Sequence, residues 1–230
     1  MSLELLRSRL DELTSGFPEL EELCDRCLSS RRWGGSAVLM VVDAAFTSIG
    51  LSYFRSVVPA VARIKRELVD RGVLTSLEEL AEVDVDSVRA FWRNGRSWEV
   101  ARGVAAKLVE LEGDDVSRLR RWASSATLEG WREDPVGSLR GVGLVTYQYL
   151  RMMGGIDTSM PDRIVKRVIN GLLSECGFGP VEDDVEFVRT VERVSRATGY
   201  RAVELTWLTW LLHETELMRR PTYREVVHMI

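Results

Sequence analysis

Leu139-Arg-Gly-Val-Gly-Leu-Val-Thr146 is the stretch of this sequence that decides the fold. Two glycines with one residue between them, and with helical sequence on both sides, predict a tight turn between two helices. The reason is that glycine adopts positive φ and allows close backbone approach. A helix that begins after Gly143 has unbonded N–H groups in its first turn, and such groups bind phosphate. We therefore expect this hairpin to hold the backbone of a nucleic acid.

A carboxylate follows the hairpin at the start of another helix. Asp162 stands 19 residues after Gly143, within Pro161-Asp-Arg-Ile-Val-Lys-Arg-Val168. Ser159 is the expected N-cap of that helix, and an acid in the first turn stabilises the helix dipole without any catalytic role. The same position also suits a catalytic acid, and Asp157 is the second candidate.

Together these motifs resemble the helix-hairpin-helix DNA glycosylase superfamily, and in particular its endonuclease III-like group. The family's hairpin reads Leu-Pro-Gly-Val-Gly-x-x-Thr-Ala, and this chain matches it at Leu139, Gly141, Val142, Gly143 and Thr146. Arg140 replaces the proline and Tyr147 the alanine. The family's catalytic aspartate stands five residues before an Arg-Val pair, as Asp162 does before Arg167-Val168. The resemblance covers roughly residues 36–173.

The resemblance implies an all-α, two-lobed fold with a helix-hairpin-helix motif that binds double-stranded DNA. We expect residues 36–153 to form the central lobe, with the hairpin at 139–146, and residues 1–35 and 154–230 to form the second lobe of one compact unit. In relatives DNA binds across the groove between the lobes. The expected DNA contacts are Gly141, Val142, Gly143, Val145, Thr146, Arg163, Lys166 and Arg167. The family also implies a Na⁺ or K⁺ ion at the hairpin carbonyls, and no other metal.

The implied activity is that of a DNA glycosylase of base excision repair, with Asp162 as the catalytic carboxylate that acts when a damaged or mispaired base leaves its sugar. Strand-cleaving relatives carry a nucleophilic lysine two positions after the second glycine, and Val145 occupies that position here. We therefore expect a monofunctional enzyme. Candidates for the base pocket are Trp98, Tyr53 and His213, although core packing is the commoner role of such residues.

Two departures from the family, Val145 and Ala44-Ala45, leave a second interpretation open. Ala44-Ala45 replaces the glutamines that probe DNA in relatives. The alternative is a catalytically silent helix-hairpin-helix DNA-binding protein. No cysteine follows Cys176, so the four-cysteine iron–sulfur loop of many relatives is absent, and we expect no cofactor. Cys24-x-x-Cys27 lacks a matching second pair for a zinc site.

Helical periodicity dominates the sequence, which itself predicts an all-α protein. The expected helices span residues 2–13, 18–28, 36–49, 53–71, 86–92, 97–111, 116–124, 127–131, 135–139, 144–153, 161–174, 181–198, 202–219 and 223–227, with another that begins at Thr75 or Ser76.

Composition limits the classes of protein. The 230 residues are 45% hydrophobic and 29% charged, enough for a full core, and no long apolar run or signal-peptide pattern is found. We expect a monomeric intracellular protein of the cytoplasm and nucleoid. The net charge of −4 argues against non-specific coating of DNA, yet residues 139–170 carry a net charge of +3. Only three amide side chains occur, which favours a thermophilic source. Only three lysines occur among many arginines, and a genome's base composition can also favour arginine.

Overall fold

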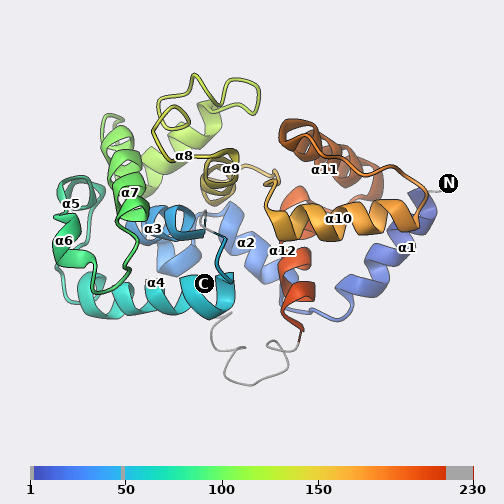
Figure 1. Ribbon diagram of the computed structural model, residues 1–230, viewed down its shortest axis with the longest axis horizontal. Helices are drawn as coiled ribbons and strands as arrows, with labels where there is room; N and C mark the ends of the chain where they lie inside the picture. The colour runs from blue at the N-terminus through green and yellow to red at the C-terminus, as the bar shows by residue number, and fades with distance from the viewer. Residues whose placement is uncertain (1–2, 48–49, 216–229) are drawn as a thin grey trace. The chain divides into compact units, whose positions relative to one another are not determined.

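The computed structural model describes residues 3–47, 50–215 and 230. Over these ranges the chain forms helices and no strand, so the all-α prediction is confirmed (Figure 1). No helix within the described ranges is both long enough and apolar enough to cross a bilayer. The helix expected at 223–227 lies outside the described residues, as do the last residues of the one expected at 202–219.

The chain divides into two compact units. Of the described residues, 3–26 and 157–215 form one, here called the terminal unit, and 27–47, 50–156 and 230 form the other, the central unit. The first boundary therefore falls after Arg26, not after residue 35 as the sequence predicts. The reason is that Arg32 and Trp33 donate hydrogen bonds to Asp43, which ties this segment to the central unit.

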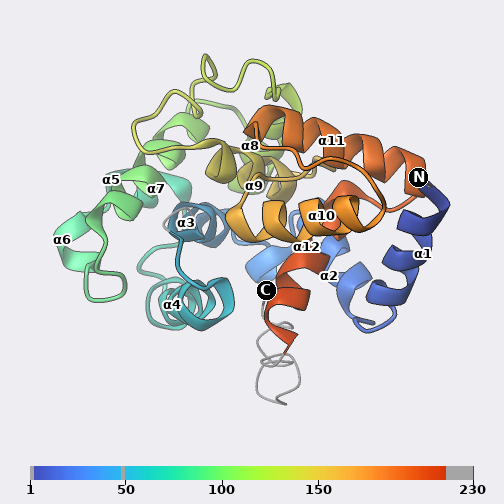
Figure 2. The same ribbon diagram turned by 45° about the vertical axis from the view of Figure 1, so that its right-hand side comes forward.

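The central unit is built around one apolar helix, α3, which spans Ala37–Thr47 and is buried along its whole length. At least five other α-helices of the unit pack against it, and Figures 1 and 2 show it lying among them. Phe46 of α3 stacks on Trp92 and meets Trp98 edge-on, which fills the core with aromatic rings. The other helices of the unit are α4 (Val58–Ile64), α5 (Leu77–Glu82), α6 (Val85–Val88), α7 (Gly95–Leu108), α8 (Asp115–Ser125) and α9 (Leu144–Met153).

The terminal unit is built around α12, Ala202–His213, which is buried over most of its length. Two helices, α10 and α11, pack against α12, and α1 packs against both of them. The bounds of these helices are Leu3–Thr14 for α1, Arg163–Glu175 for α10 and Asp184–Thr198 for α11. Helix α2, Leu20–Leu28, runs across the boundary between the units.

Local sequence explains most helix ends. Ser76 caps α5 and Glu79 reaches back to complete a capping box, as the sequence around Thr75 predicts. Pro59 sits in the first turn of α4, where its missing N–H is not needed. The helical stretch expected over 53–71 continues through π-type turns on both sides of α4, at Tyr53–Val57 and Lys65–Val69.

The segment before the hairpin differs from expectation, because neither 127–131 nor 135–139 forms a regular helix. Asp134 Oδ1 accepts hydrogen bonds from the N–H groups of Val136 and Gly137 and from the indole of Trp122. A Cβ at Gly137 would lie 1.7 Å from the carbonyl oxygen of Trp131. This tight turn uses the backbone groups that a helix would need, so the first arm of the hairpin is a turn.

Candidate functional site

The hairpin turn requires glycine at Gly141. Its φ is +95°, and a Cβ there would lie 2.9 Å from Cγ2 of Val100 on α7. Leu139 packs over Gly103 of the same helix, where a Cβ would lie 3.4 Å from its side chain. The turn is thus seated directly on α7, which fixes the direction in which the next helix starts.

The next helix, α9, begins with an open N-terminus. Its N-cap is Gly143, at φ −100° and ψ 173°, and no side chain caps it. The N–H groups of residues 143–146 donate no hydrogen bond to any described residue. A Cβ added at Gly143 would meet no atom within 4 Å. Unbonded N–H groups, a helix dipole and free space are the features that an oxyanion needs.

The other hairpin side chains differ in exposure. Val145 is partly exposed, whereas Val142 is 8% and Thr146 1% exposed. The Thr146 hydroxyl has no partner among the described residues, and its burial means that only its N–H could meet DNA. Arg140, which replaces the family's proline, is exposed and makes no side-chain hydrogen bond or ion pair with the described part of the chain. The cation expected at the hairpin carbonyls stays a prediction.

In the terminal unit, Asp162 is the N-cap of α10. Its Oδ1 accepts the N–H of Ile164 at 2.8 Å and the indole N–H of Trp210 at 3.4 Å. Its Oδ2 accepts no hydrogen bond from the described residues, and the side chain is partly exposed. One oxygen therefore fixes the carboxylate while the other is available.

This corrects the expectation that Ser159 caps the helix. Ser159 is fully buried, and its hydroxyl shares a 2.7 Å hydrogen bond with Thr206. Asp157, the second candidate acid, is engaged at another helix start, since its Oδ1 accepts the N–H of Val203 at 2.9 Å in the first turn of α12. Both acids therefore accept a backbone N–H at a helix start through Oδ1, and Asp162 differs in being partly buried and in accepting the indole N–H of Trp210 as well.

The basic side chains of α10 differ in whether they are already bonded to other groups of the protein. Lys166 follows Asp162 by one helical turn, but its ammonium group donates to Asp184 at 2.8 Å and to the carbonyl of Glu182. Arg167 donates to Nδ1 of His213 at 2.9 Å. Arg163 is exposed and makes no ion pair within the described ranges. A shallow pocket of about 430 Å³ is lined by Arg163, Lys166, Arg167, Asn170, Glu182 and Asp184.

Two of the three base-pocket candidates are core residues. Trp98 is fully buried and donates its indole N–H to the carbonyl of Trp92. Tyr53 is 5% exposed and its hydroxyl is hydrogen-bonded inside the central unit. Neither ring offers a free face for a base, so this expectation is wrong for both. His213 is exposed at the end of α12, where Nδ1 accepts from Arg167 because a guanidinium can only donate.

The sequence interpretation missed a buried polar cluster in the central unit. Asp43 is fully buried in α3 and accepts hydrogen bonds from Arg32, Trp33, Tyr53 and Tyr149. Burial raises the pKa of each of the two tyrosines well above its usual value. The signal was present, because a single acid inside an otherwise apolar helix implies a buried cationic or hydrogen-bonding partner.

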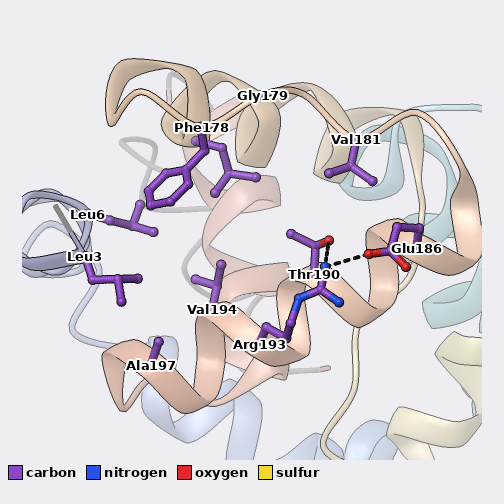
Figure 3. A pocket seen from close by; sticks show the side chains of 11 residues that line it. Leu3, Leu6, Phe178, Gly179, Val181, Glu186, Thr190, Arg193, Val194 and Ala197 are labelled. Carbon is purple, nitrogen blue, oxygen red and sulfur yellow. Dashed lines mark hydrogen bonds and ion pairs between the residues drawn. The ribbon is translucent and has the colours of Figure 1, made fainter. Parts of the chain in front are cut away.

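A second hollow, in the terminal unit, is apolar. It has a volume of about 430 Å³, and Figure 3 shows Leu3, Leu6, Phe178 and Val194 around it. The two charged side chains drawn there are bonded to each other: Arg193 donates to Glu186 at 2.6 Å, and it also donates to Thr190 at 2.8 Å. This hollow contains no unengaged acid or base, so it is a poor candidate for catalysis.

Neither unit shows a clustered metal site. The three cysteines are buried and form no disulfide with one another, and within the described ranges no group of three or more His, Cys, Asp or Glu side chains is placed to hold a metal ion.

Comparison with known proteins leaves the family open. No protein-family model matches this sequence, no curated protein is detectably similar to it, and no solved structure matches it.

Proposed function

We propose that this protein is a monofunctional DNA glycosylase, which binds double-stranded DNA and hydrolyses the bond between a damaged or mispaired base and its sugar. The observation that carries the proposal is the hydrogen bonding of the Asp162 carboxylate. Its carboxylate is held by one oxygen at the start of α10, while the other oxygen accepts no bond from the described residues. It occupies the position that the sequence register predicts for a catalytic acid.

A fixed carboxylate suits the chemistry of base release. As the C1′–N bond breaks, its electron pair leaves with the base and positive charge develops on the sugar. A carboxylate beside the sugar stabilises that charge. It can also accept the proton of the water whose oxygen forms the new C1′–O bond. Because Asp162 needs Oδ1 for the helix cap, Oδ2 is the oxygen that we assign to this work.

A capping bond alone does not distinguish Asp162 from other aspartates of this chain. Asp114 and Asp183 also cap helices, accepting the N–H groups of Ser117 and Glu186. Both are exposed and neither is held by an indole, whereas Asp162 is partly buried against Trp210. Asp162 is therefore better positioned than an ordinary capping acid.

DNA binding is assigned to the N-terminus of α9. Its four unbonded N–H groups and the free space at Gly143 suit one phosphate of the DNA backbone. Such contacts position DNA without reading its sequence. Arg140 and Arg163 are exposed cations that can add phosphate contacts, whereas Lys166 would first have to leave Asp184. The expected partner is thus any duplex that presents a suitable lesion.

A panel of duplexes, each with a single lesion or mismatch, tests the proposal. Each duplex is incubated with the protein and then treated with alkali, which cleaves the strand at an abasic site. The proposal requires at least one duplex to give cleavage that depends on alkali. The Asp162→Asn variant should give none, while Asp183→Asn, a change at a comparable helix cap, should behave as the wild type. Cleavage that survives Asp162→Asn at the wild-type rate contradicts the assignment.

The second candidate function is a DNA-binding protein without catalysis. It is favoured by the burial of Trp98 and Tyr53, which leaves neither ring available to stack on an extruded base. The two functions differ in one measurement. A silent protein binds duplex DNA with the salt dependence of phosphate contacts but releases no base from any duplex in the panel.

A further inference from the structure

The Asp43 cluster converges on a single oxygen atom. Oδ2 of Asp43 accepts from Trp33 at 2.8 Å, Tyr53 at 3.0 Å, Arg32 at 3.1 Å and Tyr149 at 3.2 Å. Arg32 and Asp43 are fully buried. A buried ion pair of this kind has few alternative arrangements, because any movement that separates the partners leaves a charge without compensation.

The donors come from three separate segments of the central unit and meet α3. One is the segment at residues 30–33, the second is the helical turn at Tyr53–Val57, and the third is α9. Tyr149 is the contribution of α9, six residues after Gly143. The hydroxyl of Tyr149 also lies 3.2 Å from that of Tyr53. The helix that starts at the hairpin is therefore tied by its middle to the central helix.

The segment at 30–33 holds α9 at a second point. The hydroxyl of Ser30 donates to the carbonyl of Met153 at 2.7 Å, at the last residue of α9. Ser30 and Trp33 both have positive φ, at 56° and 55°, which is strained for residues other than glycine. Strain of this kind persists only where the surroundings enforce it. Two strained residues of one short segment thus contact α9 and the cluster that binds it.

We propose that the Asp43 cluster is a positioning device for the hairpin, and that Tyr149 is the residue through which it acts. By fixing α9 against α3, it holds the unbonded N–H groups at the start of α9 in the arrangement that a phosphate requires. A binding site that is already ordered does not lose that conformational freedom when its ligand arrives, so affinity is higher. This inference rests on the proposed function, since it assigns a role in binding DNA at that same site.

Two single-atom changes separate positioning from general stability. Tyr149→Phe removes the one hydroxyl that α9 contributes to the cluster and keeps the ring. Tyr53→Phe is the matched control, because its hydroxyl contacts Asp43, Arg32 and Tyr149 but does not belong to α9. In that control Tyr149 can still donate to Asp43. A purely structural role of the cluster predicts instead that the effect of each change on binding follows its loss of melting temperature.

The readouts are the Kd for duplex DNA and amide hydrogen exchange across residues 147–153 of α9, both compared with the melting temperature. We expect Tyr149→Phe to raise the Kd about three- to tenfold, the range that the net free energy of one hydrogen bond covers, and to speed exchange in α9. Tyr53→Phe should change both less than Tyr149→Phe does, even where its melting temperature is lower. Equal effects of the two changes, or an unchanged Kd in Tyr149→Phe, overturn the inference.

The test also distinguishes this inference from the proposed function. If the wild-type protein binds no duplex DNA, the proposed function fails at that step. Hydrogen exchange is then the readout that tests the role of the cluster. Faster exchange in α9 for Tyr149→Phe than for Tyr53→Phe supports positioning, and equal rates overturn the inference. If Tyr149→Phe does not fold, the double variant Arg32→Met/Asp43→Leu replaces it, because apolar residues often substitute for a buried ion pair without loss of stability. A stably folded double variant that binds DNA as the wild type does contradicts the inference.

Discussion

Replacing Gly143 with aspartate separates folding from DNA binding more sharply than any other change at the hairpin. Gly143 has an extended φ of −100° and space for a Cβ, so the backbone accepts a side chain without strain. The new carboxylate would cap α9, which has no side-chain cap. Such a cap is expected to add a few tenths of a kcal/mol, and the helix dipole about 0.3–1 kcal/mol more. The protein should therefore be as stable as the wild type or slightly more stable.

The same carboxylate would occupy the place of the phosphate. It accepts the N–H groups that the phosphate would use and adds a negative charge beside it. The favourable term lost is that of an anion at a helix N-terminus, up to about 2 kcal/mol in a good geometry, and repulsion adds to it. We expect the Kd for duplex DNA to rise at least about tenfold, since about 1.4 kcal/mol corresponds to each factor of ten.

Fluorescence anisotropy with a labelled duplex measures this Kd at several salt concentrations. Gly143→Asn is the control, because it has the same shape and capping ability without the charge. The difference in affinity between the two variants should shrink as salt rises, since the repulsion is screened. If Gly143→Asp is stable and binds duplex DNA as tightly as the wild type, then the start of α9 does not hold a phosphate and the hairpin assignment is wrong.

The remaining predictions concern the acid, the nucleophile, the turn and the tyrosines. Asp162→Asn should change the free energy of unfolding by about 1 kcal/mol or less, because asparagine caps helices as well as aspartate does. Its rate of single-turnover base release should fall by orders of magnitude. If thermal denaturation shows that the variant does not fold, Asp162 has a structural role instead. Borohydride should trap no covalent adduct with lesion-bearing DNA, because Val145 cannot form a Schiff base and the ammonium of Lys166 is held by Asp184; an adduct that is lost in Lys166→Ala would contradict this. Gly141→Ala should destabilise the protein by about 1–2 kcal/mol or more in urea titrations, since its φ of +95° is strained for alanine and its Cβ would crowd Val100; an unchanged midpoint would show that the turn adapts. Burial raises the pKa values of Tyr53 and Tyr149, so above about pH 10 the unfolded chain loses tyrosine protons that the folded chain keeps. The free energy of unfolding should therefore fall as pH rises. Equal tyrosinate absorbance in folded and denatured protein at that pH would contradict this prediction.

Several elements follow directly from the sequence. The apolar run that starts near residue 36 becomes the buried helix α3, and the second arm of the hairpin spans Leu144–Met153 as expected. Both have strong local determinants, since a long apolar run must be buried and a glycine pair must break a helix. The capping box at Ser76 is recognisable for the same reason, because its two bonds lie within one turn.

Other features depend on contacts between distant residues and could not be read from periodicity. The turn before the hairpin depends on Asp134, whose oxygen binds Trp122 on another helix. The N-cap of α10 moves from Ser159 to Asp162 because Ser159 is bonded to Thr206. The partners of Asp43 likewise lie far apart in the sequence, from Arg32 to Tyr149. The one sign of them in the sequence is the position of Asp43, a single acid within an apolar helix.

Release of a free base from duplex DNA is the most direct test of the central claim. Lesion-bearing duplexes are incubated with excess protein, the small-molecule fraction is analysed by mass spectrometry, and the DNA is examined on a denaturing gel before and after alkali. The account predicts one free base per modified duplex, a strand that stays full length until alkali is added, and no base from Asp162→Asn. Duplexes that are bound but release no base, across every lesion and mismatch tested, would contradict the account and leave a DNA-binding protein without catalysis.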